Sequence, residues 1–173
     1  MPDLRSVPDD TKWRTATRCS TRLAALYDVI FRPVLKERYD DLEQDIWVHM
    51  AQFSYEIAAS LQFPMNTARE LAESLRSVNT ILFGPEFKDE VIEVGDTGAV
   101  IIVRRCPHVT GECPGPEDGT FRRCMAFTLT SQKAMNPAFS SRFVRAMCAG
   151  DRQCEIRIDP EKNPAKKPDA HTS

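Results

Sequence analysis

The sequence predicts an α+β protein in which N-terminal helices pack on a small antiparallel sheet, with the order ββαββ in the C-terminal half. Three observations support this fold class. Apolar residues recur at helical spacing through the first half of the chain, the period changes to strand-like alternation near residue 85, and Pro and Gly residues separate the segments. Helices and strands therefore occupy separate parts of the chain, as in α+β proteins.

The length of 173 residues is enough for one domain with a hydrophobic core. We expect a flexible leader over residues 1–14, a single domain over 15–159 and a disordered, Pro- and Lys-rich tail over 160–173. Within the domain, residues 15–84 should be helical and residues 85–159 should contain the sheet.

Three apolar stripes in the first half predict three helices. The segment RLAALYDVIF carries the first stripe, and the second runs from Leu35 to Leu61 in steps of three and four residues. The third begins at Thr67 and Glu70, which match a capping box, and ends at Gly84-Pro85.

The second half changes to short β-rich runs. EVIEV and AVIIVRR flank GDTG, a hairpin turn signal, and a Pro- and Gly-rich loop follows them. The segment TFRRCMAFTLTSQKAM predicts a helix that Asn136-Pro137 closes. FSSRFVRAMC and QCEIRI then predict a second hairpin.

The last hairpin carries one cysteine on each side of its turn. A three-residue loop over 150–152 would place Cys148 opposite Cys154 and gather the apolar side chains on one face, whereas a two-residue loop would turn the two thiols apart. That apolar face would hold Val144, Ala146, Cys148, Cys154, Ile156 and Ile158. We therefore predict two inward, neighbouring thiols that can share a metal, and two core thiols remain the alternative.

Five of the six cysteines lie between residues 106 and 154, in the second half of the chain. We expect a cytoplasmic protein, because the N-terminal segment lacks the apolar core of a signal peptide. Disulfides are disfavoured in that compartment, so clustered thiols there bind metals or take part in catalysis more often than they cross-link. Free cysteines are also common core residues, and that interpretation stays open.

The segments VIIVRRCPH, CMAFTLTSQKAMNP and MCAGDRQCEIRI resemble the L-2-amino-thiazoline-4-carboxylic acid hydrolase-like family and the related 4-vinyl reductase small-molecule-binding domain. The resemblance covers the sheet half of the chain. It implies a ligand pocket between the helices and the sheet, with a zinc ion held beside it by thiolates of the terminal hairpin and the preceding helix.

Carried onto this sequence, the resemblance implies Cys154 as a hairpin ligand and Cys124 as the helix ligand. Cys148 lies two residues nearer the turn than in the family pattern but keeps the same strand face. Cys106 or Cys113 would then supply the fourth ligand. The spacings match neither a zinc finger nor a zinc ribbon and no CxxC occurs, so zinc and a 4Fe-4S cluster are alternatives.

Three further residues are candidates for binding an organic ligand. Arg105 and Arg123 stand beside cysteines and would suit a carboxylate if they faced the pocket. His108 follows Cys106 by two residues, and the two could form a nucleophile–base pair. An exposed loop imidazole is the alternative for His108.

The function predicted from these residues is a metal-binding domain that binds a small organic ligand as a sensor or carrier. The alternative is a small hydrolase of the L-2-amino-thiazoline-4-carboxylate type that uses a cysteine or metal-bound water. The formal net charge of −2 gives no basis for nucleic-acid binding, and no stretch reaches the roughly 18 apolar residues of a membrane span. A homodimer is left open.

Overall fold

The chain forms helices followed by a sheet in the order that the sequence predicts, and the α+β prediction is confirmed. The computed structural model describes residues 3–95, 97–110 and 117–161. In chain order the elements are η1 (Leu4–Ser6), α1 (Asp9–Leu35), α2 (Glu37–Ser60), α3 (Ala68–Phe83), β1 (Lys88–Val94), β2 (Gly98–Arg105), α4 (Pro107–Thr110), α5 (Glu117–Met135), β3 (Phe139–Arg145), η2 (Met147–Ala149) and β4 (Cys154–Pro160). The short helix α4 lies in the segment predicted as a loop.

The strands form an antiparallel sheet in the order β1-β2-β4-β3, so β2 and β4 are central. Alternate residues of the two central strands are buried on one face. These residues are Ala99, Ile101, Val103, Cys154, Ile156 and Ile158. The opposite face carries ion pairs such as Arg145 with Glu155. Burial of one face explains the alternating pattern in the sequence.

Helix α3 supplies the helical side of the core. Leu71, Leu75 and Val78 are almost completely buried and cluster with the inward residues of β2 and β4. The capping box is present, because the Thr67 hydroxyl accepts the Glu70 N–H at 3.1 Å and the Glu70 carboxylate accepts the Thr67 N–H at 3.2 Å. The helix therefore begins and packs as its local sequence predicts.

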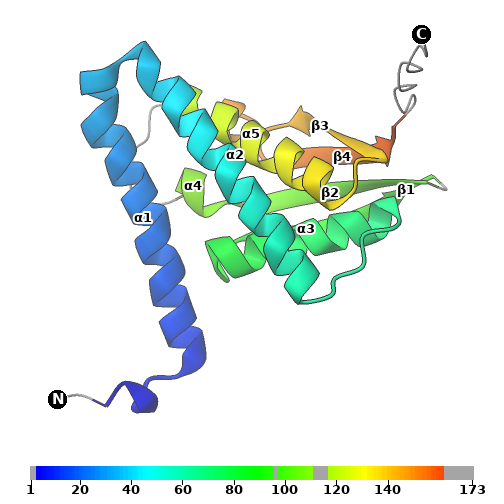
Figure 1. The fold of residues 1–173 in the computed structure, drawn as a ribbon, viewed down its shortest axis with the longest axis horizontal. Helices are drawn as coiled ribbons and strands as arrows, with labels where there is room; N and C mark the ends of the chain where they lie inside the picture. The colour runs from blue at the N-terminus through cyan, green and yellow to red at the C-terminus, as the bar shows by residue number, and fades with distance from the viewer. Residues whose placement is uncertain (1–2, 96, 111–116, 162–173) are drawn as a thin grey trace, which may run out of the picture.

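The other helices complete the layer. Figure 1 shows α2 crossing α5 and α3, and α2 contacts both of them. Within the described residues, no helix combines the length and the apolar composition that a membrane crossing requires.

Helix α1 lies at the edge of the molecule (Figure 1). It docks on the C-terminal end of α3 and the loop after it, where Trp13 donates to the Ile81 carbonyl at 3.1 Å and Arg14 pairs with Glu86 at 2.8 Å. Residues 9–14, which were expected to belong to a flexible leader, are the first turns of this helix. At the other end of the chain Pro160 still belongs to β4, and residues 162–173 of the expected tail lie outside the described residues.

The predicted register of the last hairpin is wrong. Phe143 pairs with Ile156 and Arg145 pairs with Glu155, with an irregularity between Phe143 and Arg145 that leaves Val144 about half exposed. Cys148 lies in η2 rather than on a strand, so it is not the cross-strand neighbour of Cys154.

Two local features explain this difference. Asp151 closes a longer turn, because its carboxylate accepts the Ala146 N–H at 2.9 Å and its own N–H donates to the Ala146 carbonyl at 3.2 Å. Gly150 supplies the left-handed conformation with φ of +98° that the turn requires. The inward place opposite Ile156 goes to Phe143, whose ring packs on Phe121 at 5.5 Å between centroids.

Candidate ligand-binding pocket

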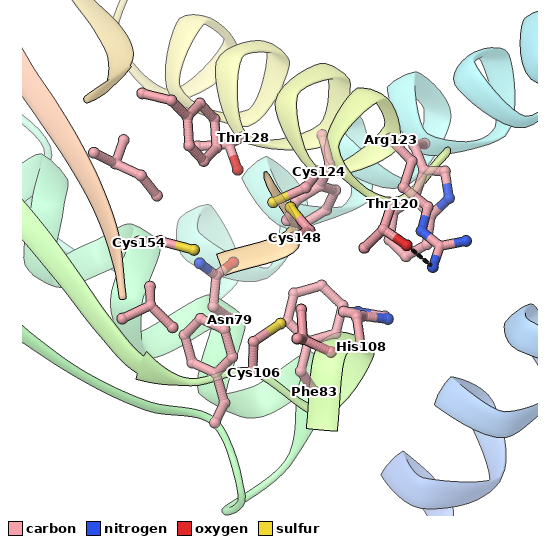
Figure 2. Close-up of a pocket in the computed structure, with 17 residues that line it drawn as sticks. Asn79, Phe83, Cys106, His108, Thr120, Arg123, Cys124, Thr128, Cys148 and Cys154 are labelled. Atoms are coloured by element: carbon pink, nitrogen blue, oxygen red, sulfur yellow. Dashed lines mark hydrogen bonds between the residues drawn. The ribbon is translucent and has the colours of Figure 1, made fainter. Parts of the chain in front are cut away.

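A pocket lies between the helices and the sheet, where β2 ends and β4 begins (Figure 2). Side chains from α2, α3, α4, α5, η2 and the three strands β2, β3 and β4 line it. Its cavity volume is about 50 Å³. Since one water needs roughly 10–15 Å³ of such space, the cavity has room for a few small groups.

One wall of the pocket is an aromatic cage around His108. The imidazole lies 4.9 Å from the ring of Phe83 and 5.5 Å from the ring of Trp47, both in edge-on geometry. Phe127 completes the cage at 5.5 Å from Phe83 and 5.7 Å from Trp47. Rings contributed by α2, α3 and α5 thus surround one polar side chain from α4.

Burial determines the protonation state of His108. Removal from water lowers its pKa to about 4, and the nearby positive charge of Arg123 acts in the same direction. The imidazole is therefore neutral at pH 7. Its Nε2 atom is buried and has no hydrogen-bond partner among the described residues. An unpaired buried polar atom of this kind costs about 1–3 kcal/mol unless a bound group satisfies it.

Four of the five predicted thiol ligands line this pocket. Cys106 follows β2, Cys124 lies on α5, Cys148 on η2 and Cys154 at the start of β4. Figure 2 shows their sulfur atoms directed toward the same central space. Cys113 lies outside the described residues. Cys148 and Cys154 both line the pocket, although the hairpin register from which we predicted them to be neighbours is wrong.

The thiols are protonated at neutral pH in this environment. Burial raises the pKa of Cys106 to about 11, and it raises the pKa values of Cys124, Cys148 and Cys154 as well. Neighbouring thiols reinforce the effect on Cys106, Cys124 and Cys148, because ionising one disfavours ionising the next. Among the described residues, no group of three or more His, Cys, Asp or Glu side chains stands in a metal-binding arrangement.

A buried ion network forms the boundary of the pocket toward α1 and α2. The Arg123 guanidinium donates to Glu43 at 2.8 Å and to the Thr120 hydroxyl at 3.0 Å. Asp28 of α1 lies 3.9 Å from the same guanidinium and accepts from Arg32 at 2.7 Å. Arg123 thus lines the pocket while pairing with a helix 80 residues earlier in the chain.

The other predicted ligand-binding residues occupy different surroundings. His108 is partly buried against the aromatic cage, with its Nε2 atom out of contact with solvent, rather than exposed in a loop. Arg105 is exposed at the end of β2 and is not among the side chains that line the pocket.

Several pocket residues had no place in the sequence-based site. Thr120, Phe127 and Thr128 share one face of α5 with Cys124 and lie four, three and four residues from it. That helical period, applied outward from Cys124, is the signal that would have identified them. Asn79 of α3 had no comparable signal.

No family model matches the chain, and no curated protein matches it, so the family resemblance is not confirmed. Solved structures do share its fold. Trafficking protein particle complex subunit 3 from Naegleria fowleri, solved covalently bound to palmitic acid, is 16% identical with a TM-score of 0.57, over 83% of this chain and 96% of that one. The phenol-responsive sensory domain of the transcription activator PoxR, solved with phenol, is 13% identical with a TM-score of 0.53, over 82% of this chain and 74% of that one. At these identities the likeness shows the fold alone.

Proposed function

We propose that this protein binds a small, neutral, ring-containing organic molecule in the pocket and acts as a sensor or carrier. The observation that carries this proposal is His108, whose neutral imidazole has an unpaired Nε2 atom inside an aromatic cage. Apolar walls with a few placed polar groups are typical of small-molecule sites. A ligand hydroxyl would satisfy Nε2 while its ring packs among Trp47, Phe83 and Phe127.

Size and charge narrow the ligand class. The cavity of about 50 Å³ is smaller than the roughly 150 Å³ of a cavity that takes benzene, so even one ring requires the pocket side chains to move apart. A long acyl chain fits this space poorly. Arg123 is already paired with Glu43, which argues against a carboxylate as the polar group. The PoxR sensory domain, solved with phenol, is one protein of this fold that holds a hydroxyl-bearing ring.

Calorimetric titration with phenol and with toluene tests this function. Phenol should bind more tightly than toluene, because only phenol offers a hydroxyl to Nε2. His108→Phe keeps a ring of similar size and should remove most of this preference. The matched control is His49→Phe on α2, a histidine that does not line the pocket, and it should leave the preference unchanged. Equal binding of phenol to wild type and His108→Phe, or no binding of either probe, would refute the proposal.

We also propose that the pocket thiols hold a soft metal ion, with zinc as the first candidate and a 4Fe-4S cluster as the alternative. Convergence of Cys106, Cys124, Cys148 and Cys154 on one space supports it, and thiolate donors suit both groups. Cys113 stays an alternative fourth ligand. A bound cation would supply the positive charge that lets these thiols ionise despite their burial.

Metal content is the direct test of this second proposal. Protein purified without oxygen should contain about one zinc per chain, or it should show the absorption band of an iron–sulfur cluster near 400 nm. Cys154→Ser should lower both metal content and thermal stability, whereas Cys19→Ser, at an exposed position on α1, should change neither. Full metal content in Cys154→Ser, or none in the wild type, would assign the thiols to core packing.

Hydrolysis by a cysteine has less support than binding. A nucleophilic cysteine requires a lowered pKa or an adjacent base, whereas burial raises the pKa of each thiol in the pocket. The neutral imidazole of His108 could serve as such a base, but its Nε2 atom has no hydrogen-bond partner among the described residues and therefore does not contact a cysteine thiol. We therefore place binding before catalysis.

A further inference from the structure

Helix α3 places one polar side chain in the wall of the pocket without giving it a partner. Asn79 lines the pocket and is only 8% exposed. Its side-chain amide makes no hydrogen bond to any residue in the described part of the chain. An amide offers two donors and one acceptor, so a buried amide without partners weakens the fold unless a bound group pairs with it.

Comparable side chains elsewhere in the fold are fully paired. Gln132, the other buried side-chain amide among the described residues, makes three hydrogen bonds of 2.8 to 2.9 Å. Ser74, the other buried polar residue of α3, donates to the Pro64 carbonyl at 2.7 Å. The fold therefore satisfies the polar groups that serve its own packing, and Asn79 departs from this rule at the pocket.

Asn79 and His108 approach the pocket from different walls. Asn79 lies on α3 four residues before Phe83, so it is one helical turn from the ring on which His108 packs at 4.9 Å. Figure 2 shows the Asn79 amide directed into the central space that the sulfur atoms surround, with Cys106 between it and His108 in this view. The apolar interior thus has an unpaired polar group on each of two sides.

The hydroxyl and guanidinium groups of the pocket wall already have partners. The Thr120 hydroxyl accepts from Arg123 at 3.0 Å, and the same guanidinium donates to Glu43 at 2.8 Å. The Thr128 hydroxyl interacts with the Cys124 thiol one turn earlier on α5. These groups are committed within the protein, whereas the amide of Asn79 is available to a ligand.

We propose that Asn79 determines specificity by binding a second polar group of the ligand, at the end of the ring opposite the hydroxyl that pairs with His108. This inference rests on the proposed ligand-binding function. The second group is neutral and both donates and accepts, as a hydroxyl or a carboxamide does, because the Asn79 amide offers donors and an acceptor. A charged group would have no free counter-ion in this wall, since Arg123 is paired with Glu43. The ligand class is therefore a phenol with a neutral polar substituent in the para position.

Calorimetric titration with hydroquinone and with 4-methylphenol tests this assignment in the full chain, without oxygen so that hydroquinone is not oxidised. The two probes have similar size and share the hydroxyl for His108, and they differ by a hydroxyl or a methyl group at the opposite end. Wild type should bind hydroquinone about tenfold more tightly. Asn79→Leu keeps a branched side chain and should reverse this preference. The matched control is Asn66→Leu, at an exposed position outside the pocket, and it should keep the wild-type preference.

Thermal melting without a ligand gives a second readout. Asn79→Leu should melt at a higher temperature than the wild type, because it removes an unpaired buried amide that serves binding rather than folding. A lower melting temperature would overturn the inference and assign the amide to the fold.

The outcome with phenol and toluene separates this inference from the function on which it rests. If wild type prefers phenol to toluene but binds hydroquinone no better than 4-methylphenol, the role of Asn79 is wrong and the proposed function stands. The same follows if Asn79→Leu keeps the preference for hydroquinone. If none of the four probes binds to the wild type, both the proposed function and the role of Asn79 are wrong.

Discussion

Helices α3 and α1 bury opposite kinds of side chain. Seven of the 16 residues of α3 are buried and most are apolar, whereas the two buried residues of the 27-residue α1 are Thr17 and Asp28. Both helices carry an apolar stripe in the sequence. The stripe of α3 meets the sheet of its own chain and the stripe of α1 meets solvent. An apolar stripe therefore predicts a helix with a face to bury, but not the molecule against which it is buried.

Arg123 of α5 links the apolar core to the polar inner face of α1. From α5 it lines the pocket beside the apolar core, and it pairs with Glu43 while Asp28 of α1 lies 3.9 Å away. The polar inner face of α1 is thereby tied to the wall of the candidate ligand site. Breaking this contact tests whether ion pairing holds the α1–α2 side of the molecule as firmly as apolar packing holds the α3 side.

The largest effect is expected from Arg123→Met. Removing the guanidinium leaves Glu43 buried without this partner, and breaking a buried pair on one side costs about 3–5 kcal/mol of unfolding free energy. Urea denaturation measures this loss. Replacing both partners, as in Arg123→Met with Glu43→Leu, should recover a large part of it. A single variant as stable as the wild type would mean that the network does not hold α1 and α2 in place.

Matched leucine substitutions compare the two helices directly. Leu75→Ala in α3 should cost about 2–5 kcal/mol of unfolding free energy, because Leu75 is only 2% exposed. Leu26→Ala in α1, where leucine is 41% exposed, should cost under about 0.5 kcal/mol in the same denaturation experiment. Equal losses under these conditions would show that the stripe of α1 packs within its own chain.

The sequence predicts what local contacts determine. Thr67 and Glu70 are three residues apart, so the start of α3 is readable in one segment. The hairpin register was misread because an apolar count favoured Val144, whereas a strand irregularity and the Asp151 turn decide which residues face inward. The burial of Arg123 depends on Glu43, and no local pattern links two residues 80 positions apart.

The pH dependence of His108 gives a smaller expected effect. Its folded pKa of about 4 lies below its unfolded value of 6.5, so the unfolded chain binds a proton first as the pH falls. The stability due to neutral His108 is fully present above pH 6.5 and is lost as the pH approaches 4, by roughly 3 kcal/mol at most. Wild type should therefore lose stability relative to His108→Phe over this range.

Comparison of the wild type with His108→Phe separates the effect of His108 on the pH dependence of stability from that of Asp89. Burial raises the pKa of Asp89 to about 6, so the contribution of Asp89 to stability changes in the opposite direction over the same range, in both proteins alike. Thermal melts at pH 7 and pH 4.5 give the difference between the two proteins. Parallel losses in wild type and His108→Phe would mean that His108 is not buried in its neutral form.

The smallest effects on stability are expected from removing a single threonine hydroxyl group from α3 or from α1. Thr67 caps α3 by accepting the Glu70 N–H, so Thr67→Ala should cost about 1 kcal/mol of unfolding free energy. Thr15 on α1 is exposed and its hydroxyl only donates to the Thr11 carbonyl one turn earlier, which satisfies no orphan amide. Thr15→Ala should therefore change stability by less than about 0.5 kcal/mol. Urea denaturation of both variants measures the difference in unfolding free energy. A larger loss for Thr15→Ala than for Thr67→Ala would contradict the interpretation that a local cap stabilises α3 whereas inward charges hold α1.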